Sequence, residues 1–131
     1  MVLPRAVYAW KFWLLCLLCY CGLIWFLSNQ PALPVPQLFH MQDKLIHAGA
    51  YAVMAWLLWH AGRGYLSTPM LAVTAVVVCS LFGVTDEWHQ YYVSGRQADV
   101  YDWLADTVGA LLLTTVLYKR EFVIATGGRT R

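Results

Sequence analysis

Four long apolar runs in this chain of 131 residues restrict it to a narrow class of folds. We place them at residues 10–27, 45–61, 69–85 and 100–118. Each approaches the roughly 17 to 25 residues of helix that cross a bilayer. The chain is 60% hydrophobic and only 12% charged, which is unlike an ordinary soluble domain. The sequence therefore predicts an all-α fold, an integral membrane bundle of four transmembrane helices, in a single domain over residues 1–131. Nothing in it indicates a nucleic-acid partner.

The three connections differ in character. The first, residues 28–44, is expected to be an extended polar loop because prolines remove backbone donors and disfavour helix. The second, residues 62–68, is short and Gly-rich, and Pro69 is well placed to begin the next helix. The third, residues 88–99, is polar. The prolines of the first connection are Pro31, Pro34 and Pro36.

Basic residues predict the orientation, because cytoplasmic segments carry an excess of Lys and Arg. Seven fall on the side shared by both termini and the second connection: Arg5, Lys11, Arg63, Lys119, Arg120, Arg129 and Arg131. Only Lys44 and Arg96 fall on the other side. We therefore expect both termini in the cytoplasm and the first and third connections outside. The first run could instead be a cleaved signal peptide, but it is longer than a usual signal core and no clear cleavage site follows it.

Cysteine spacing leaves two interpretations. Cys16 and Cys19 form a C-x-x-C pair of the kind found in zinc or redox sites. These residues and Cys21 lie midway along a Leu-rich run, however, and Cys79 lies inside the third run. Packing between helices is therefore the favoured interpretation, and no disulfide framework is predicted.

Acidic residues gather at the predicted outer ends of the runs. Six of the seven lie in two short stretches. A carboxylate inside hydrocarbon is costly unless it is paired, protonated or facing water, so this clustering indicates a functional site. The six residues are Asp43, Asp86, Glu87, Asp99, Asp102 and Asp106.

The first polar pattern is D-K-L-I-H-A-G-A-Y, from Asp43 to Tyr51. Lys44, His47 and Tyr51 share one helical face by spacing. A structural interpretation makes Asp43 an N-cap or first-turn acid, lets Lys44 snorkel and puts Tyr51 in an aromatic belt. His47 resists that interpretation because it lies a turn inside the apolar run.

The second pattern, T-D-E-W-H-Q, closes the third run. Glu87 and Gln90 can share a face, and Asp86 is expected to point elsewhere. Adjacent acids at a helix C-terminus oppose the macrodipole, so local stability does not account for them. The structural alternative is an acidic patch in interfacial water.

The third pattern places Asp99, Asp102 and Asp106 in one stripe along a helix that begins near Asp99. Capping of the helix N-terminus explains Asp99 and at most also Asp102. Asp106 lies two turns in, so it has to face the bundle interior with a partner or a raised pKa. Gly109, one turn later, suits close packing against a neighbouring helix.

Together these patterns, D-K-L-I-H-A-G-A-Y and D-E-W-H-Q-Y-Y-V-S-G-R-Q-A-D-V-Y-D-W-L-A-D-T-V-G, resemble the VanZ-like family of small bacterial membrane proteins. The resemblance covers roughly residues 43–109. In the family's pattern the position of Asp106 is usually Asn, so this chain carries an additional ionisable group there, and Gly commonly stands where this chain has Leu113. The resemblance implies the bacterial cytoplasmic membrane and a link to resistance against the lipoglycopeptide teicoplanin, which is met at the outer leaflet. It does not identify a reaction.

The leading hypothesis is an outward-facing polar pocket formed by the second, third and fourth helices. Its substrate is expected to be an amphipathic or lipid-linked envelope molecule, with hydrolysis or transfer as the chemistry. The catalytic candidates are Glu87 as acid or base with a raised pKa, His47 as its proton partner or a metal ligand, and Asp102 and Asp106 to orient His47 or a cation. The candidates for substrate binding are Lys44, Tyr51, Asp86, Gln90, Asp99 and Arg96, the last as an anion clamp or an ion-pair partner.

Several alternatives remain open at this point. One His with several carboxylates can hold a divalent metal, although no tight ligand motif is present. The same pocket can belong to a non-enzymatic envelope binding or modulator protein, or to a small proton- or cation-coupled carrier, for which four helices leave little room without an oligomer. A purely structural role is weakest, because carboxylates are costly as helix contacts.

Overall fold

A computed structural model describes residues 6–31, 36 and 38–127. These residues form four α-helices and no β-strand, which confirms the predicted all-α class and the number of helices. The predicted roles of Arg5, Pro34, Arg129 and Arg131 lie outside the described residues. The helices are α1 (Ala6–Ser28), α2 (Gln42–Gly62), α3 (Thr68–Tyr91) and α4 (Val100–Gly127).

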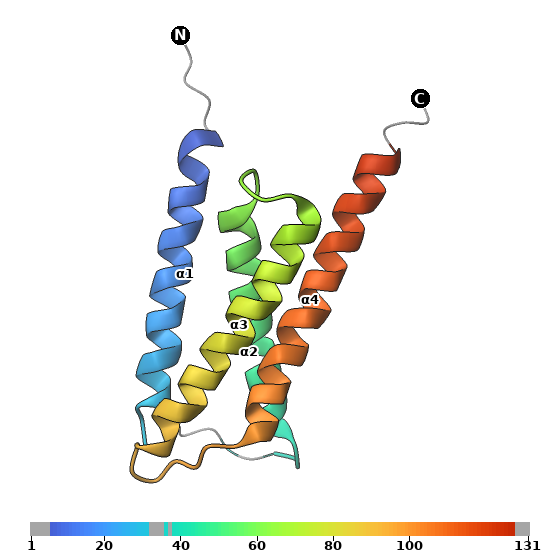
Figure 1. Cartoon of the computed structure of the whole chain (residues 1–131). Coiled ribbons are helices and arrows are strands. Elements are labelled where there is room, and N and C mark those ends of the chain that lie inside the picture. Colours follow the sequence, from blue (N-terminus) through green and yellow to red (C-terminus); the bar gives the residue numbers. More distant parts are fainter. Residues whose placement is uncertain (1–5, 32–35, 37, 128–131) are drawn as a thin grey trace.

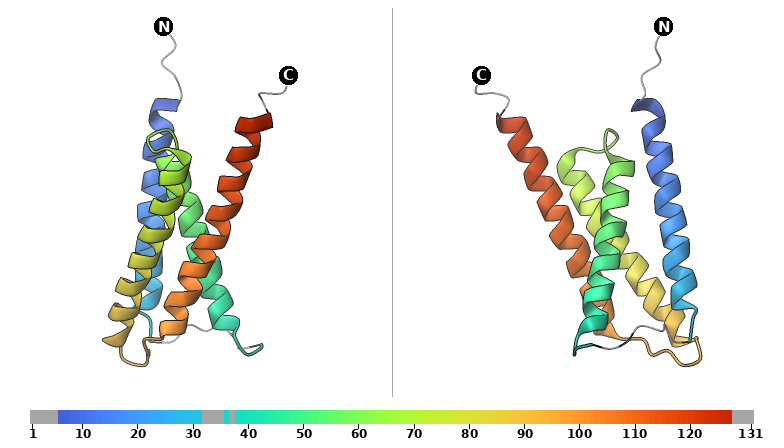
Figure 2. Two further views of the ribbon diagram at one scale, coloured as in Figure 1. Left: turned by 45° about the vertical axis from the view of Figure 1, so that its right-hand side comes forward. Right: turned by 180° about the vertical axis from the view of Figure 1, so that it is seen from behind.

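The helices run alternately up and down (Figure 1). The beginning of α1, the α2–α3 connection and the end of α4 lie together at one end. The end of α1, the beginning of α2 and the α3–α4 connection lie at the other, which we call the acidic end. Helix α4 packs against both α2 and α3, and α1 packs mainly against α2. Figure 2 shows α4 leaning away from the bundle toward its C-terminal end.

Two helices are longer than predicted. Helix α3 continues to Tyr91 rather than ending near residue 85, and α4 continues to Gly127 rather than near 118. The third connection therefore begins after Tyr91, and the whole T-D-E-W-H-Q pattern is helical. An ion pair of 2.8 Å between Arg63 and Glu121, the seventh acidic residue, joins the α2–α3 connection to the extended part of α4.

Two helical segments, Ala9–Ser28 and Thr68–Tyr91, are long and apolar enough to cross a membrane by length and composition. The helices α2 and α4 do not pass the same test. Large apolar side chains are nevertheless exposed on the outer faces of several helices, including Leu15 at 61%, Val73 at 65% and Leu112 at 64%. Such outward-facing apolar surface is typical of a protein whose solvent is lipid.

Close contact between α2 and α4 depends on Gly109. A Cβ atom at this position would overlap the backbone carbonyl of Ala48. The absence of a side chain therefore lets the two backbones touch, which confirms the predicted close packing. This contact lies one turn beyond Asp106 and fixes α4 against the part of α2 that carries His47.

The cysteines are free thiols. Cys79 is fully buried in the core, Cys16 and Cys21 are partly buried, and Cys19 is exposed. The predicted packing role is therefore confirmed for Cys79. It is wrong for Cys19, which faces away from the other helices because α1 contacts the bundle along one side only.

Candidate polar site at the acidic end of three helices

Lys44 joins α2 to α4 at the rim of the site. Its Nζ atom donates hydrogen bonds to Asp99 at 2.6 Å, to Asp102 at 2.7 Å and to the neighbouring Asp43 at 3.0 Å. The side chain is only 16% exposed. Lys44 is therefore held by three carboxylates, and the interpretation in which it snorkels away from the bundle is wrong.

Asp99 begins α4 and connects it to both neighbouring helices. Its Oδ1 accepts a hydrogen bond of 2.8 Å from the backbone N–H of Tyr101, which is the cap expected at this position. The Lys44 ammonium that donates to Asp99 lowers the pKa of its carboxyl group, and the Tyr101 N–H lowers it further. The Asp99 backbone N–H donates to Glu87 Oε2 at 2.8 Å, which brings in α3.

His47 and Asp106 form the deeper connection between α2 and α4. His47 Nδ1 lies 2.9 Å from Asp106 Oδ1, and His47 Nε2 lies 3.8 Å from Asp102 Oδ1. Asp106 is completely buried, at 0% exposure. Gly83 of α3 makes room for it, because a Cβ atom there would lie 2.9 Å from Asp106 Oδ2.

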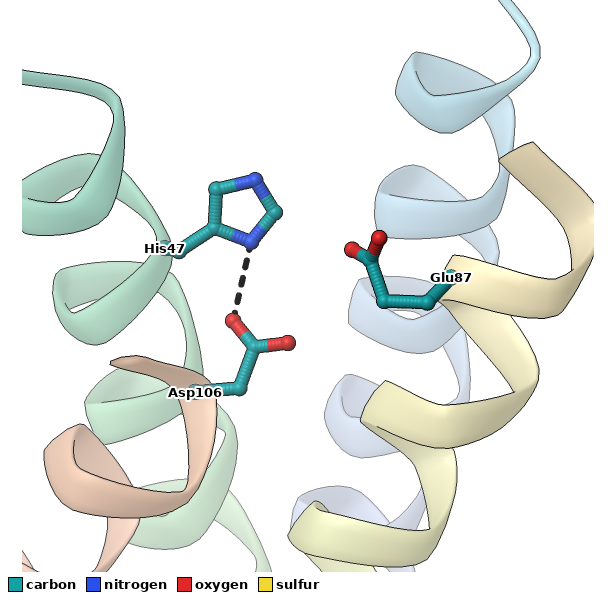
Figure 3. A group of neighbouring side chains, drawn as sticks. All are labelled: His47, Glu87 and Asp106. Atoms are coloured by element: carbon teal, nitrogen blue, oxygen red, sulfur yellow. Dashed lines mark hydrogen bonds and ion pairs between the residues drawn. The ribbon is translucent and has the colours of Figure 1, made fainter. Parts of the chain in front are cut away.

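Glu87 closes the site from α3. Figure 3 shows its carboxylate pointing toward His47 and Asp106 across the space between the helices. Ligand atoms of the three side chains all lie within 4.8 Å of one another. Glu87 Oε1 and Asp106 Oδ2 are buried and have no hydrogen-bond partner among the described residues. We call His47, Glu87 and Asp106 the central triad.

Asp86 and Gln90 extend the site toward α1. The amide of Gln90 donates to Asp86 Oδ2 at 3.2 Å and approaches Ser28 Oγ at 3.5 Å. Asp86 is 1% exposed and contacts Gln90, so the expectation that it points away from the side of α3 that carries Gln90 is wrong. The interpretation as an acidic patch in interfacial water also fails, because Asp86 and Glu87 are both buried. The physical reason is that α3 is covered on two sides, by α4 and by the end of α1.

Tyr51 and Arg96 are the two remaining predicted site residues, and in the part of the chain that the structure describes neither forms a hydrogen bond or ion pair with the carboxylates described above. Tyr51 is 1% exposed, and its hydroxyl has no hydrogen-bond partner among the described residues. The structural interpretation that places Tyr51 in an aromatic belt is therefore wrong, and its predicted role in the pocket stays a prediction. Arg96 lies in the α3–α4 connection and forms no ion pair with a carboxylate within the described part of the chain. Its proposed role as an anion clamp stays a prediction, as do the roles of the other site residues.

A polar contact outside the predicted set fastens α3 to α4. Trp103 Nε1 donates to Ser80 Oγ at 3.1 Å, and Thr107 Oγ1 donates to the same oxygen at 3.0 Å. The signal in the sequence was the spacing of Trp103 and Thr107, which places two donors on one face of α4. Their partner could not be inferred, because nothing local relates them to Ser80.

This arrangement supports two kinds of chemistry. An imidazole beside buried carboxylates can exchange protons, because small changes in its surroundings move its charge across neutral pH. The same groups can also ligate a cation. The central triad can thus exchange protons or bind a cation. The ion pairs of Lys44 connect α2 to α4 at the rim of the site.

Comparison with known proteins confirms the family resemblance that the sequence patterns indicate. A model of the VanZ/LLP1 family matches residues 12–123, which include α2, α3, most of α1 and α4, and all of the site. Neither the curated proteins nor the solved structures contain a match to the chain. Family membership and the two apolar helices indicate a membrane protein. The chain therefore belongs to the VanZ/LLP1 family.

Proposed function

We propose that this chain is a multi-pass protein of the bacterial cytoplasmic membrane whose acidic end faces the envelope and acts on an amphipathic or lipid-linked envelope molecule. In this proposal all four helices cross the membrane and both termini are cytoplasmic. The molecule is either a lipid-linked cell-wall precursor or a lipoglycopeptide such as teicoplanin, and the link to glycopeptide resistance follows from it.

The observation that carries the proposal is the convergence of three helices on one group of buried ionisable side chains. His47 comes from α2, Glu87 from α3 and Asp106 from α4, and they meet within 4.8 Å. Burying carboxylates costs free energy, at least about 1–3 kcal/mol for each charged group that lacks a partner. Apolar residues at these three positions would stabilise the bundle at least as well, so stability alone does not explain the ionisable side chains.

Charge distribution supports the orientation. Within the described residues, the basic side chains of the first part of α1, the α2–α3 connection and the last part of α4 belong to the end opposite the acidic end; they are Lys11, Arg63, Lys119 and Arg120. The basic residues at the acidic end are Lys44 and Arg96, and Lys44 is neutralised by its ion pairs. The excess of basic charge away from the site favours a cytoplasmic location for that opposite end.

The proposed chemistry assigns proton transfer to Glu87 and His47. Glu87 is held by the Asp99 N–H through one oxygen and keeps the other free. His47 is oriented by Asp106. A headgroup that enters between them would meet one proton donor and one acceptor, which suits hydrolysis or group transfer. Arg96 would attract an anionic headgroup at the entrance.

Teicoplanin susceptibility of a Gram-positive host that produces the full chain tests this function. We expect the wild-type chain to raise the inhibitory concentration of teicoplanin more than that of vancomycin, which lacks the lipid tail. Glu87→Gln should abolish the effect at equal abundance in the membrane, because it removes the ionisable group while keeping the shape of the side chain. Glu121→Gln is the matched control, since it alters a carboxylate at the opposite end.

Two outcomes would contradict the proposal. Unchanged susceptibility with abundant wild-type protein would remove the lipoglycopeptide as the molecule acted on. An equal effect from wild type and Glu87→Gln would show that the site binds without proton transfer, which is the behaviour of an envelope modulator rather than an enzyme.

A further inference from the structure

The central triad combines one imidazole with two carboxylates on three different helices. Its ligand atoms lie within 4.8 Å of one another. Ligands that share one transition-metal ion at about 2.0–2.2 Å lie at most roughly 4.4 Å apart, so only a small closure of side chains separates this arrangement from a coordination sphere. No cross-helix movement is needed, because the three side chains already point toward a common centre (Figure 3).

Unpartnered buried oxygens point into the same space. Asp106 is 0% exposed and Glu87 is 7% exposed. Within the described chain, Asp106 Oδ2 and Glu87 Oε1 have no hydrogen-bond partner, and the hydroxyl of Tyr51 nearby is also unpaired. Native structures rarely leave such atoms unsatisfied, and an ion or water is a common reason when they do.

The buried carboxylates near the central triad would be balanced by a bound cation. Asp86, Glu87 and Asp106 are three buried acids in one region. Lys44 is already bound by Asp43, Asp99 and Asp102 at the rim. A divalent ion at the centre would balance the deeper acids, which the lysine contacts do not reach.

A neighbouring group already orients Glu87, and a second carboxylate lies close to His47. The Asp99 N–H holds Glu87 Oε2 at 2.8 Å and leaves Oε1 free to bind. His47 Nδ1 faces Asp106, and Nε2 lies 3.8 Å from Asp102 Oδ1. The 3.8 Å separation is longer than a hydrogen bond, and closing it would give the contact to a carboxylate that the second nitrogen of a metal-bound histidine usually makes.

We propose that His47, Glu87 and Asp106 form a binding site for a divalent transition-metal ion, Mn²⁺ or Zn²⁺, with Asp102 orienting His47. Carboxylates suit Mn²⁺ and imidazole suits Zn²⁺, so a mixed set selects these ions over Mg²⁺ or Ca²⁺. The inference rests on the proposed function in one respect: an envelope-facing site takes its ion from the outer aqueous phase. When bound, the ion would polarise an oxygen of an anionic headgroup, and Glu87 and His47 would then serve as its ligands in place of the proton-transfer roles proposed above.

Mn²⁺ titration of the purified full chain in detergent tests the site, with electron paramagnetic resonance as the measurement. We expect one bound ion per chain and a pulsed spectrum that shows nitrogen coupling from one imidazole. Zn²⁺ should displace the Mn²⁺, while Mg²⁺ at the same concentration should not. The wild-type spectrum alone decides whether histidine is a ligand, so the test does not depend on a variant that folds.

Variants then locate the ion. Glu87→Gln and Asp106→Asn should each weaken Mn²⁺ binding at least tenfold, and His47→Ala should remove the nitrogen coupling. His40→Ala, at an exposed histidine in the α1–α2 connection, and Glu121→Gln are matched controls that should bind as the wild type does. Absence of a stoichiometric ion in the wild-type chain, or nitrogen coupling that survives in His47→Ala, would overturn the site. Neither result depends on teicoplanin susceptibility, so failure of the metal site and failure of the proposed function can be told apart.

Discussion

His47 Nδ1 lies 2.9 Å from Asp106 Oδ1, although 59 positions separate the two residues in the chain. The contact joins α2 to α4 in the interior of the bundle, where Asp106 is fully buried. Interactions of this kind are worth more than exposed ion pairs, because leaving one partner alone exposes a buried polar group to an apolar environment.

A double-mutant cycle should measure this contact. We expect His47→Ala and Asp106→Asn to show a coupling of about 0.5–3 kcal/mol in the free energy of unfolding in detergent. The pair Arg63 and Glu121 serves as a reference, because the Arg63 side chain is 58% exposed and such pairs contribute roughly 0–1 kcal/mol. Equal coupling in the two cycles would contradict the importance assigned to the buried contact.

Gly109→Ala should destabilise the bundle. The added methyl group would meet the backbone carbonyl of Ala48, which cannot move without separating α2 from α4. Overpacking of this kind costs about 1–3 kcal/mol, and thermal unfolding of the purified chain would report it. Gly49→Ala is the control, since nothing lies within 4 Å of a Cβ atom there. Equal unfolding temperatures for the two variants would refute the proposed backbone contact.

Gly83→Ala should disturb the site more than the bundle. A methyl group at this position would lie 2.9 Å from Asp106 Oδ2, so the carboxylate has to turn or shift. We expect Mn²⁺ binding by the purified chain to weaken several-fold while the helix content by circular dichroism stays unchanged. Wild-type affinity in Gly83→Ala would show that the position of Asp106 does not matter for the ion.

The sequence predicted the helices well because their signal is local. Apolar runs of sufficient length define α1 to α4, and the acids that interrupt them mark one end. Helix ends were less certain: α3 continues through Asp86 to Gln90 because tertiary contacts cover these residues. The local sequence also does not show which neighbouring helix each polar face packs against. The direction of Asp86 is not predicted correctly because its burial depends on which neighbouring helix packs against it, and spacing within one helix does not reveal this.

The rim ion pair predicts a dependence on pH. The pKa of Asp99 is lowered below its ordinary value of 3.8, chiefly by the hydrogen bond from Lys44. A lowered folded-state pKa stabilises the fold at pH values above the unfolded pKa, and this stabilisation is lost as the pH falls through the folded value. The difference in stability between wild type and Asp99→Asn should therefore shrink below about pH 3.8. A difference that grows in acid would contradict the assigned ion pair.

The orientation of the acidic end is tested most directly by labelling with a membrane-impermeant maleimide in intact bacteria. Cys16, Cys19, Cys21 and Cys79 would first be replaced by alanine, and single cysteines placed at the exposed Ser94 in the α3–α4 connection or Tyr65 in the α2–α3 connection. We expect Ser94→Cys to be labelled in intact cells and Tyr65→Cys to be labelled only after the membrane is opened. The reverse pattern would place the acidic residues in the cytoplasm and contradict an envelope function for this site.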